Sequence, residues 1–368
     1  DIIEEIVGEI HDERDRGAAV DRLPDGRLMV RGHVPLEDLE DYDVMIEEES
    51  VPPRFDPVTR LYERDGTLSL AATVDAIRSG AGIVVHQGHA NTVSVSLGAE
   101  SIGKSDLDAL DNGDCGGLWY SVGCWSAAID QDTFAEHWLT NPFGGGVAYV
   151  GNSRYGWGCP GYPGQCVSDL YSREFFVSLF QKDLFHAGMV HADAKHQFVG
   201  TALTDDYMRY AMYELNLLGD PETPVWTDTP AVLSVAHDDL LWTTDGAADI
   251  TVEVRDSGEP VDGATVCVSS GDFSLWEVAE TGPDGLAHVS LAVAGYTEAQ
   301  VTVTARNCTP HASTVEIREG GTGIEDCPTL AVTALRQNVP NPFRGATGIS
   351  LTLAERCRAE LSIYDVAG

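Results

Sequence analysis

The chain has 368 residues, of which 43% are hydrophobic, and carries a formal net charge of −37. This length is sufficient for more than one domain with its own core. The strong negative charge disfavours binding to nucleic acid or to anionic membranes, and the sequence has no run of 18 apolar residues that could span a membrane.

Apolar runs alternate with helical patterns over residues 1–230, for example the helices expected at 169–186 and 202–218. This alternation is typical of βαβ units. It predicts an α/β domain in which a mostly parallel sheet is flanked by helices.

Two apolar runs in this part, residues 83–90 (IVVHQGHA) and 118–124 (LWYSVGC), each lead through a glycine into a reactive side chain. The carboxyl ends of parallel strands lie at one edge of a sheet, so we expect His89 and Cys124 to meet there. An imidazole beside a thiol favours the thiolate, which is the nucleophilic form. The spacing therefore indicates a cysteine nucleophile with a histidine base.

A zinc site is the main chemical alternative. Strand alternation argues against it, because it would point His86 and His89 to opposite faces unless the strand ends at residue 87. The sequence also contains no Cys-x-x-Cys step. We expect no metal at this site and no required cofactor, although acidic loops could hold structural calcium. The residues that would supply zinc ligands are His86, His89, Cys115, Cys124, Cys159 and Cys166.

The remaining cysteines indicate an oxidising compartment. Cys159 and Cys166 bracket a short loop rich in proline and glycine and are the natural partners for a disulfide. If Cys124 is a free nucleophile, at least one other of the 8 cysteines is unpaired within the chain, and Cys115 is the expected one.

From residue 231 to 318 the sequence alternates in short steps, with Asp-Gly turns between them. This pattern predicts an immunoglobulin-like β-sandwich. Residues 319–329 are rich in glycine and are expected to form a linker. Residues 330–368 begin with a proline-rich segment and continue with two alternating, strand-like segments.

The first part of the chain resembles the catalytic domain of the gingipain-like cysteine peptidases, relatives of the caspase-type enzymes. The resemblance extends from about residue 60 to 227 and rests on the order of several blocks rather than on any single one. The blocks are residues 61–65 (LYERD), 88–89 (GH), 107–113 (LDALDNG), 124 with 129–130 (C and ID), 145–153 (GGVAYVGNS) and 216–221 (NLLGDP).

This resemblance implies roles for individual residues and a substrate class. His89 matches the family's general base and Cys124 its nucleophile, while the backbone N–H groups of Ala90 and Cys124 match its oxyanion hole. Trp157 aligns with an aromatic wall of the specificity pocket. The implied substrates are proteins or peptides, cleaved after basic residues. No acidic partner for His89 is identifiable.

Two departures from the family pattern leave room for an altered pocket or a weakened enzyme. Ala90 stands where the family usually has glycine, and Trp125 begins a segment that replaces a glycine-containing turn. The alternative interpretation is therefore a non-catalytic surface protein that retains the peptidase fold as a scaffold.

Residues 335–343 (LRQNVPNPF) and the strand-like segments after them resemble the start of the C-terminal sorting domain of type IX secretion. This resemblance implies that residues 330–368 are an incomplete sorting domain recognised by the secretion machinery. It implies a secreted or cell-surface protein of a double-membraned bacterium.

Overall fold

The computed structural model describes residues 50–53, 58–113, 115–159, 161–243 and 245–320 with side chains, and the backbone of residues 20–22, 28–31, 334–335, 348 and 351–352. The chain divides into two compact units: Asp1–Val232 with Arg306–Thr309, and Leu233–Ala305 with Pro310–Gly368. Strand β10 (Ala231–Val232) pairs in parallel with β19 (Cys308–Thr309), which is why a short later segment belongs to the first unit.

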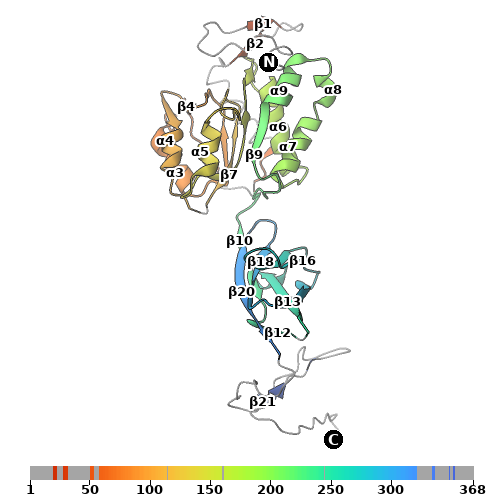
Figure 1. Cartoon of the computed structure of the whole chain (residues 1–368). Coiled ribbons are helices and arrows are strands. Elements are labelled where there is room, and N and C mark those ends of the chain that lie inside the picture. The colour runs from red at the N-terminus through yellow and green to blue at the C-terminus, as the bar shows by residue number, and fades with distance from the viewer. Residues whose placement is uncertain are drawn as a thin grey trace. The chain divides into compact units, whose positions relative to one another are not determined.

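A four-stranded sheet forms the centre of the first unit, in the order β3-β6-β7-β9 (Figure 1). Neighbours β3, β6 and β7 are parallel, and β9 is antiparallel to β7. The strands are β3 (Ile83–His86), β6 (Gly117–Ser121), β7 (Gly146–Asn152) and β9 (Leu215–Gly219).

The helix expected over residues 202–218 is wrong at its C-terminal end, where residues 215–219 form strand β9. The helix ends at Glu214, and Leu217 and Leu218 pack into the cores on opposite faces of the sheet. Successive side chains on opposite faces are the mark of a strand. Pairing with β7 therefore overrides the helical pattern at this position.

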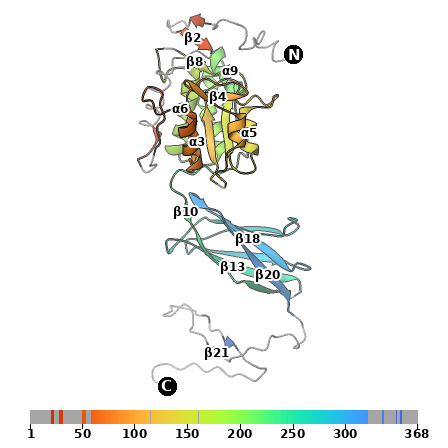
Figure 2. The same cartoon turned by 90° about the vertical axis from the view of Figure 1, so that its left-hand side faces the viewer.

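Helices cover both faces of the sheet (Figures 1 and 2). Residues of β6 alternate between the two cores: Trp119 contacts Trp138 with ring centroids 5.2 Å apart, whereas Tyr120 contacts Phe175 at 5.0 Å. Burial on both faces fixes the carboxyl end of β6. One face carries α3 (Leu70–Arg78), α4 (Lys104–Asp108) and α5 (Phe134–Thr140). The other carries α6 (Val167–Phe180), α7 (Ala187–His196), α8 (Val199–Ala202) and α9 (Asp206–Glu214).

Two small sheets adjoin the carboxyl ends of β3 and β6. One is the antiparallel hairpin of β4 (Ser94–Leu97) and β5 (Glu100–Gly103). The other has the order β1-β2-β8, and its strands are β1 (Val20–Arg22), β2 (Leu28–Arg31) and β8 (Trp157–Gly158).

The second unit is built from strands alone within its described residues. Alternate residues of β13 and β18 are buried, including Val252, Val254, Val301 and Val303, so that one face of each sheet forms a core. One sheet contains β11 (Ser234–Ala236), β13 (Ala247–Asp256), β14 (Glu259–Pro260) and β17 (Leu286–Ala292). The other contains β12 (Leu240–Thr243), β20 (His311–Glu319), β18 (Glu298–Thr304), β15 (Thr265–Ser269) and β16 (Trp276–Glu280).

Strands β21 (Ala334–Leu335) and β22 (Leu351–Thr352) pair antiparallel. Apart from residue 348, the rest of the expected sorting domain and the expected linker from residue 321 onward lie outside the described residues. Among the helices that are described, none is both long and apolar enough to cross a membrane.

Candidate active site

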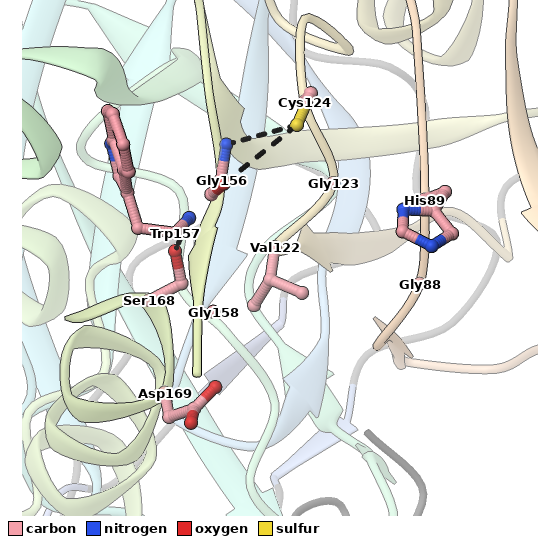
Figure 3. A pocket seen from close by; sticks show the side chains of 10 residues that line it. All are labelled: Gly88, His89, Val122, Gly123, Cys124, Gly156, Trp157, Gly158, Ser168 and Asp169. Carbon is pink, nitrogen blue, oxygen red and sulfur yellow. Dashed lines mark hydrogen bonds between the residues drawn. The ribbon is translucent and has the colours of Figure 1, made fainter. Parts of the chain in front are cut away.

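The structure brings His89 and Cys124 to one pocket at the carboxyl edge of the central sheet (Figure 3). Strand β3 ends at His86 and β6 ends at Ser121, and these two residues are paired across the parallel strands. His89 and Cys124 lie at the same distance in sequence after the ends of their strands, so the register places them on neighbouring loops. We call these loops, which follow β3 and β6, the His89 arm and the Cys124 arm. The pocket is lined by Gly88, His89, Val122, Gly123, Cys124, Gly156, Trp157, Gly158, Ser168 and Asp169.

The Cys124 thiol is buried, with 3% of the residue exposed, and it faces the backbone of Gly156. The Gly156 N–H donates to Cys124 Sγ at 3.3 Å, and the thiol donates to the Gly156 carbonyl oxygen at 3.9 Å (Figure 3). A Cβ at residue 156 would lie 2.0 Å from the Val122 carbonyl oxygen, so only glycine allows this approach. The sequence analysis did not identify Gly156, whose only signal is its place in a glycine-rich segment.

His89 is exposed, and its backbone is held by the β4 strand, because Ser96 N–H donates to His89 O at 2.8 Å. Figure 3 shows the His89 ring on one arm of the pocket and the Cys124 thiol on the other. A solvent-accessible imidazole that lines the same pocket as a thiol is suited to exchange protons with a substrate bound there.

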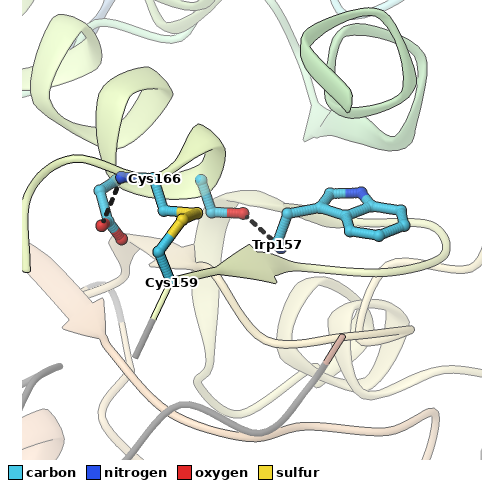
Figure 4. The surroundings of a disulfide bond; sticks show 5 residues. Trp157, Cys159 and Cys166 are labelled. Atoms are coloured by element: carbon cyan, nitrogen blue, oxygen red, sulfur yellow. Dashed lines mark hydrogen bonds between the residues drawn. A yellow bond between two sulfur atoms is a disulfide. The ribbon is translucent and has the colours of Figure 1, made fainter. Parts of the chain in front are cut away.

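Three of the six candidate zinc ligands have other partners in the structure. Cys159 and Cys166 form a disulfide, as the sequence indicated (Figure 4). His86 is buried and hydrogen-bonded to Ser121. In the part of the chain that the structure describes, no group of three or more His, Cys, Asp or Glu side chains is arranged to hold a metal ion. Cys115 has a free, exposed thiol.

Trp157 lines the pocket, but its indole points away from Cys124 and His89 (Figure 3). Its backbone N–H donates to Ser168 Oγ at 2.8 Å, and its indole Nε1 donates to Glu214 Oε2 at 3.3 Å. The ring packs edge-on against Tyr207, with centroids 5.0 Å apart. The main chain of Trp157 therefore forms the pocket wall, while the indole anchors that wall to α9.

Asp169 places a carboxylate in the pocket at the end opposite Cys124 (Figure 3). It is 6% exposed, and it is the only acidic residue among those that line the pocket. Its Oδ2 accepts a hydrogen bond from Cys166 N–H at 3.1 Å, at the start of α6. The sequence analysis missed Asp169, although an acidic residue three positions into a helix is a known capping signal.

Ala90 is buried and is not among the residues that line the pocket. It forms an isolated bridge with Val95, and its backbone φ is not in the left-handed region. A Cβ at residue 123 would lie 2.4 Å from the Ala90 Cβ, so Gly123 provides the space that Ala90 occupies. The methyl group is therefore accommodated, and the oxyanion role of the Ala90 N–H stays a prediction.

Trp125 directly follows the thiol and has a φ of 61°, a conformation that favours glycine. Its half-buried ring contacts Tyr155 edge-on at 5.8 Å, and the Arg154 guanidinium lies over it at 4.8 Å. These contacts hold a tryptophan where the family pattern has a glycine-containing turn.

We expect Trp125→Gly to be more stable than Trp125→Ala by about 0.5 to 1 kcal/mol. Both changes remove the ring, but only glycine avoids the left-handed strain of about 1 to 2 kcal/mol, which exceeds its extra unfolded-state entropy of about 0.4 to 1 kcal/mol. Urea unfolding of the two variants measures the difference. An alanine variant as stable as the glycine variant would show that residue 125 is unstrained.

Comparison with known proteins shows the family to which the chain belongs. The profile of peptidase family C25 matches residues 38–226. The crystal structure of the Arg-specific cysteine proteinase gingipain R (RgpB) is similar, with a TM-score of 0.53, 17% identity and coverage of 77% of this chain and 61% of that chain. No curated protein sequence matches.

A second similar structure is the complex of the pro- and mature domains of RgpB from Porphyromonas gingivalis, with a TM-score of 0.53, 16% identity and coverage of 77% of this chain and 63% of that one. This chain thus spans less than two thirds of the gingipain chains that it matches. It belongs to peptidase family C25, a family of cysteine peptidases, and shares its mixed α/β fold with gingipain.

Proposed function

We propose that the protein is a cysteine endopeptidase in which Cys124 is the nucleophile and His89 is the general base and acid. The observation that carries this proposal is the convergence of the His89 imidazole and the Cys124 thiol on one pocket at the ends of paired parallel strands. Two hydrogen bonds with the Gly156 main chain hold the sulfur in this pocket.

The reaction would proceed in two steps. His89 takes the proton of the Cys124 thiol as Sγ attacks the scissile carbonyl carbon, and the C–N bond then breaks as His89 gives that proton to the leaving amine, which yields a thioester. His89 then takes a proton from water, whose oxygen attacks the thioester and releases the carboxylate product and Cys124. The backbone N–H groups of Ala90 and Cys124 are the proposed donors to the oxyanion.

The preferred substrate residue before the scissile bond is basic, arginine or lysine. Asp169 is the acidic residue at the end of the pocket away from the thiol, and it is buried. A guanidinium or ammonium group that reaches this end would pair with a carboxylate shielded from water, where such a pair is strong.

Strand β8 provides the edge on which an extended substrate would lie. In the structure this edge pairs antiparallel with β2, with Val30 opposite Gly158 and Arg31 opposite Trp157. Gly158 and Trp157 both line the pocket, so a peptide that adds to the same edge would present its side chains there.

We expect Val30→Pro to raise kcat/KM for peptide substrates by about threefold or more, chiefly through a lower KM. Proline cannot donate a ladder hydrogen bond and would weaken the β2 pairing that competes with substrate for β8. Steady-state kinetics measure kcat and KM of the variant and of the wild type at equal concentrations of titrated active sites. A higher KM in this variant would mean that β2 supports the pocket rather than competing for it.

The remaining features complete the proposal for the whole chain. The second unit would serve as an immunoglobulin-like spacer, and residues 330–368 as the first part of a sorting domain that directs the protein to the cell surface or the medium. The alternating burial in β13 and β18 supports a sandwich. No cofactor takes part in the proposed reaction.

A peptide library tests the proposed function. Purified protein is incubated with peptides that differ only in the residue before the scissile bond, with and without reductant. We expect cleavage after arginine or lysine. If no peptide is cleaved while the protein remains folded, the non-catalytic scaffold is the better account.

A further inference from the structure

A buried histidine outside the pocket links the arms that carry His89 and Cys124. His86 is the last residue of β3 and lies opposite Ser121, the last residue of β6. Its Nδ1 is 2.8 Å from Ser121 Oγ, and its Nε2 is 3.1 Å from the Ser96 carbonyl oxygen. His86 is 7% exposed and Ser121 is fully buried, so neither reaches substrate.

The partners of His86 determine its tautomer and the direction of each hydrogen bond. A carbonyl oxygen can only accept, so Nε2 carries the proton and donates to Ser96 O. In the neutral ring Nδ1 then accepts from the Ser121 hydroxyl. Burial lowers the pKa of His86 to about 4, which keeps the ring neutral at neutral pH.

Each end of this chain of hydrogen bonds reaches one arm of the site. Ser121 Oγ accepts from Gly123 N–H at 3.1 Å, and Gly123 precedes the Cys124 nucleophile. Ser96 accepts from His86 through its carbonyl and donates to His89 O at 2.8 Å through its N–H.

The His86 ring also packs against the arm that carries His89. A Cβ at Gly88 would lie 2.6 Å from His86 Nε2, so the ring fills the space beneath the residue that precedes His89. One imidazole thus contacts the His89 arm directly and the Cys124 arm through a single hydroxyl.

We propose that His86 and Ser121 are positioning residues that hold the Cys124 thiol and the His89 imidazole in reacting alignment. The proposal rests on the proposed peptidase function. Because misplacing a reacting group by about 1 Å costs about a hundredfold in rate, loss of this link lowers kcat more than substrate affinity.

Two substitutions break the link and a third preserves it. Ser121→Ala removes only the hydroxyl, and His86→Leu removes both ring nitrogens at similar volume. His86→Gln keeps an amide N–H for Ser96 O and an amide oxygen for Ser121. The matched control is Ser178→Ala on α6. It removes another buried serine hydroxyl, which donates a hydrogen bond to Asp193 Oδ2 on α7 at 2.7 Å.

We expect Ser121→Ala and His86→Leu to lower kcat about tenfold or more with KM within about twofold, and His86→Gln to recover most of the loss. Ser178→Ala should retain wild-type kcat at a comparable loss of stability. Unchanged kcat in Ser121→Ala, or an equal loss in Ser178→Ala, would overturn the proposal. If His86→Leu does not fold, the smaller Ser121→Ala change carries the test.

Alkylation by iodoacetamide at pH 6 separates this proposal from the proposed function. Each cysteine is followed by mass spectrometry after chymotryptic digestion, because cleavage after Trp119 or Tyr120 separates Cys124 from the exposed Cys115, which is the internal reference. A wild-type Cys124 that reacts no faster than Cys115 would defeat the proposed function, and the positioning role with it. A fast Cys124 in wild type that slows in Ser121→Ala supports the positioning role. One that stays fast in Ser121→Ala refutes the positioning role alone.

Discussion

Cys124→Ala is expected to abolish peptide cleavage and leave the protein folded. Among the described residues that line the pocket, the change removes the only thiol and therefore the atom that would form the thioester. Activity should fall to the uncatalysed background, a loss of at least about a thousandfold. Alanine fits the space of the thiol, so the far-ultraviolet circular dichroism and the urea midpoint should change little.

His89→Ala should lower kcat by about a hundredfold to ten-thousandfold, the range of general acid–base catalysis.

The matched control for Cys124→Ala is Cys115→Ala, which removes an exposed free thiol outside the pocket and should leave kcat unchanged. Measurable turnover by Cys124→Ala, above the rate of a mock purification, would reject the assigned nucleophile.

Asp169→Asn is expected to lower kcat/KM for substrates with arginine or lysine before the scissile bond by about 30-fold to 1,000-fold. Loss of one partner of a buried charged pair costs about 2 to 4 kcal/mol, because the basic side chain is then left unpaired away from water. Asparagine retains an oxygen that can accept the Cys166 N–H, so the start of α6 should be preserved.

A matched helix-capping aspartate controls for the structural role of Asp169. Asp106 occupies the same position of α4, where its Oδ2 accepts from Gly103 N–H at 2.8 Å, and it does not line the pocket. Asp106→Asn should keep wild-type kcat/KM. Equal losses on basic and neutral substrates in Asp169→Asn would mean that Asp169 supports the fold of the pocket and does not select its substrate.

The central sheet and the convergence of His89 and Cys124 followed from local patterns. Residues 83–86 and 118–121 are apolar runs before a glycine, and parallel strands bring such ends together. Strand β9 could not be predicted in the same way, because residues 215–219 continue a helical pattern and become a strand only by pairing with β7.

The rest of the site depends on contacts between segments that are distant in sequence. Gly156 reaches Cys124 only because a loop after β7 folds back beneath Val122. The sequence identifies Asp169 only as a helix-capping residue. It lines the pocket because α6 packs against this part of the sheet. The orientation of the Trp157 indole depends on Glu214 and Tyr207, which no local pattern identifies.

Covalent labelling with a substrate-like electrophile tests the central claim most directly. The probe is a short peptidyl acyloxymethyl ketone that ends in arginine, and its partner probe ends in aspartate. The account predicts a single adduct on Cys124 with the arginine probe, little or none with the aspartate probe, and much slower labelling in His89→Ala. Labelling of Cys115 at the rate of Cys124, or no adduct on Cys124 in the folded wild-type protein, would contradict it.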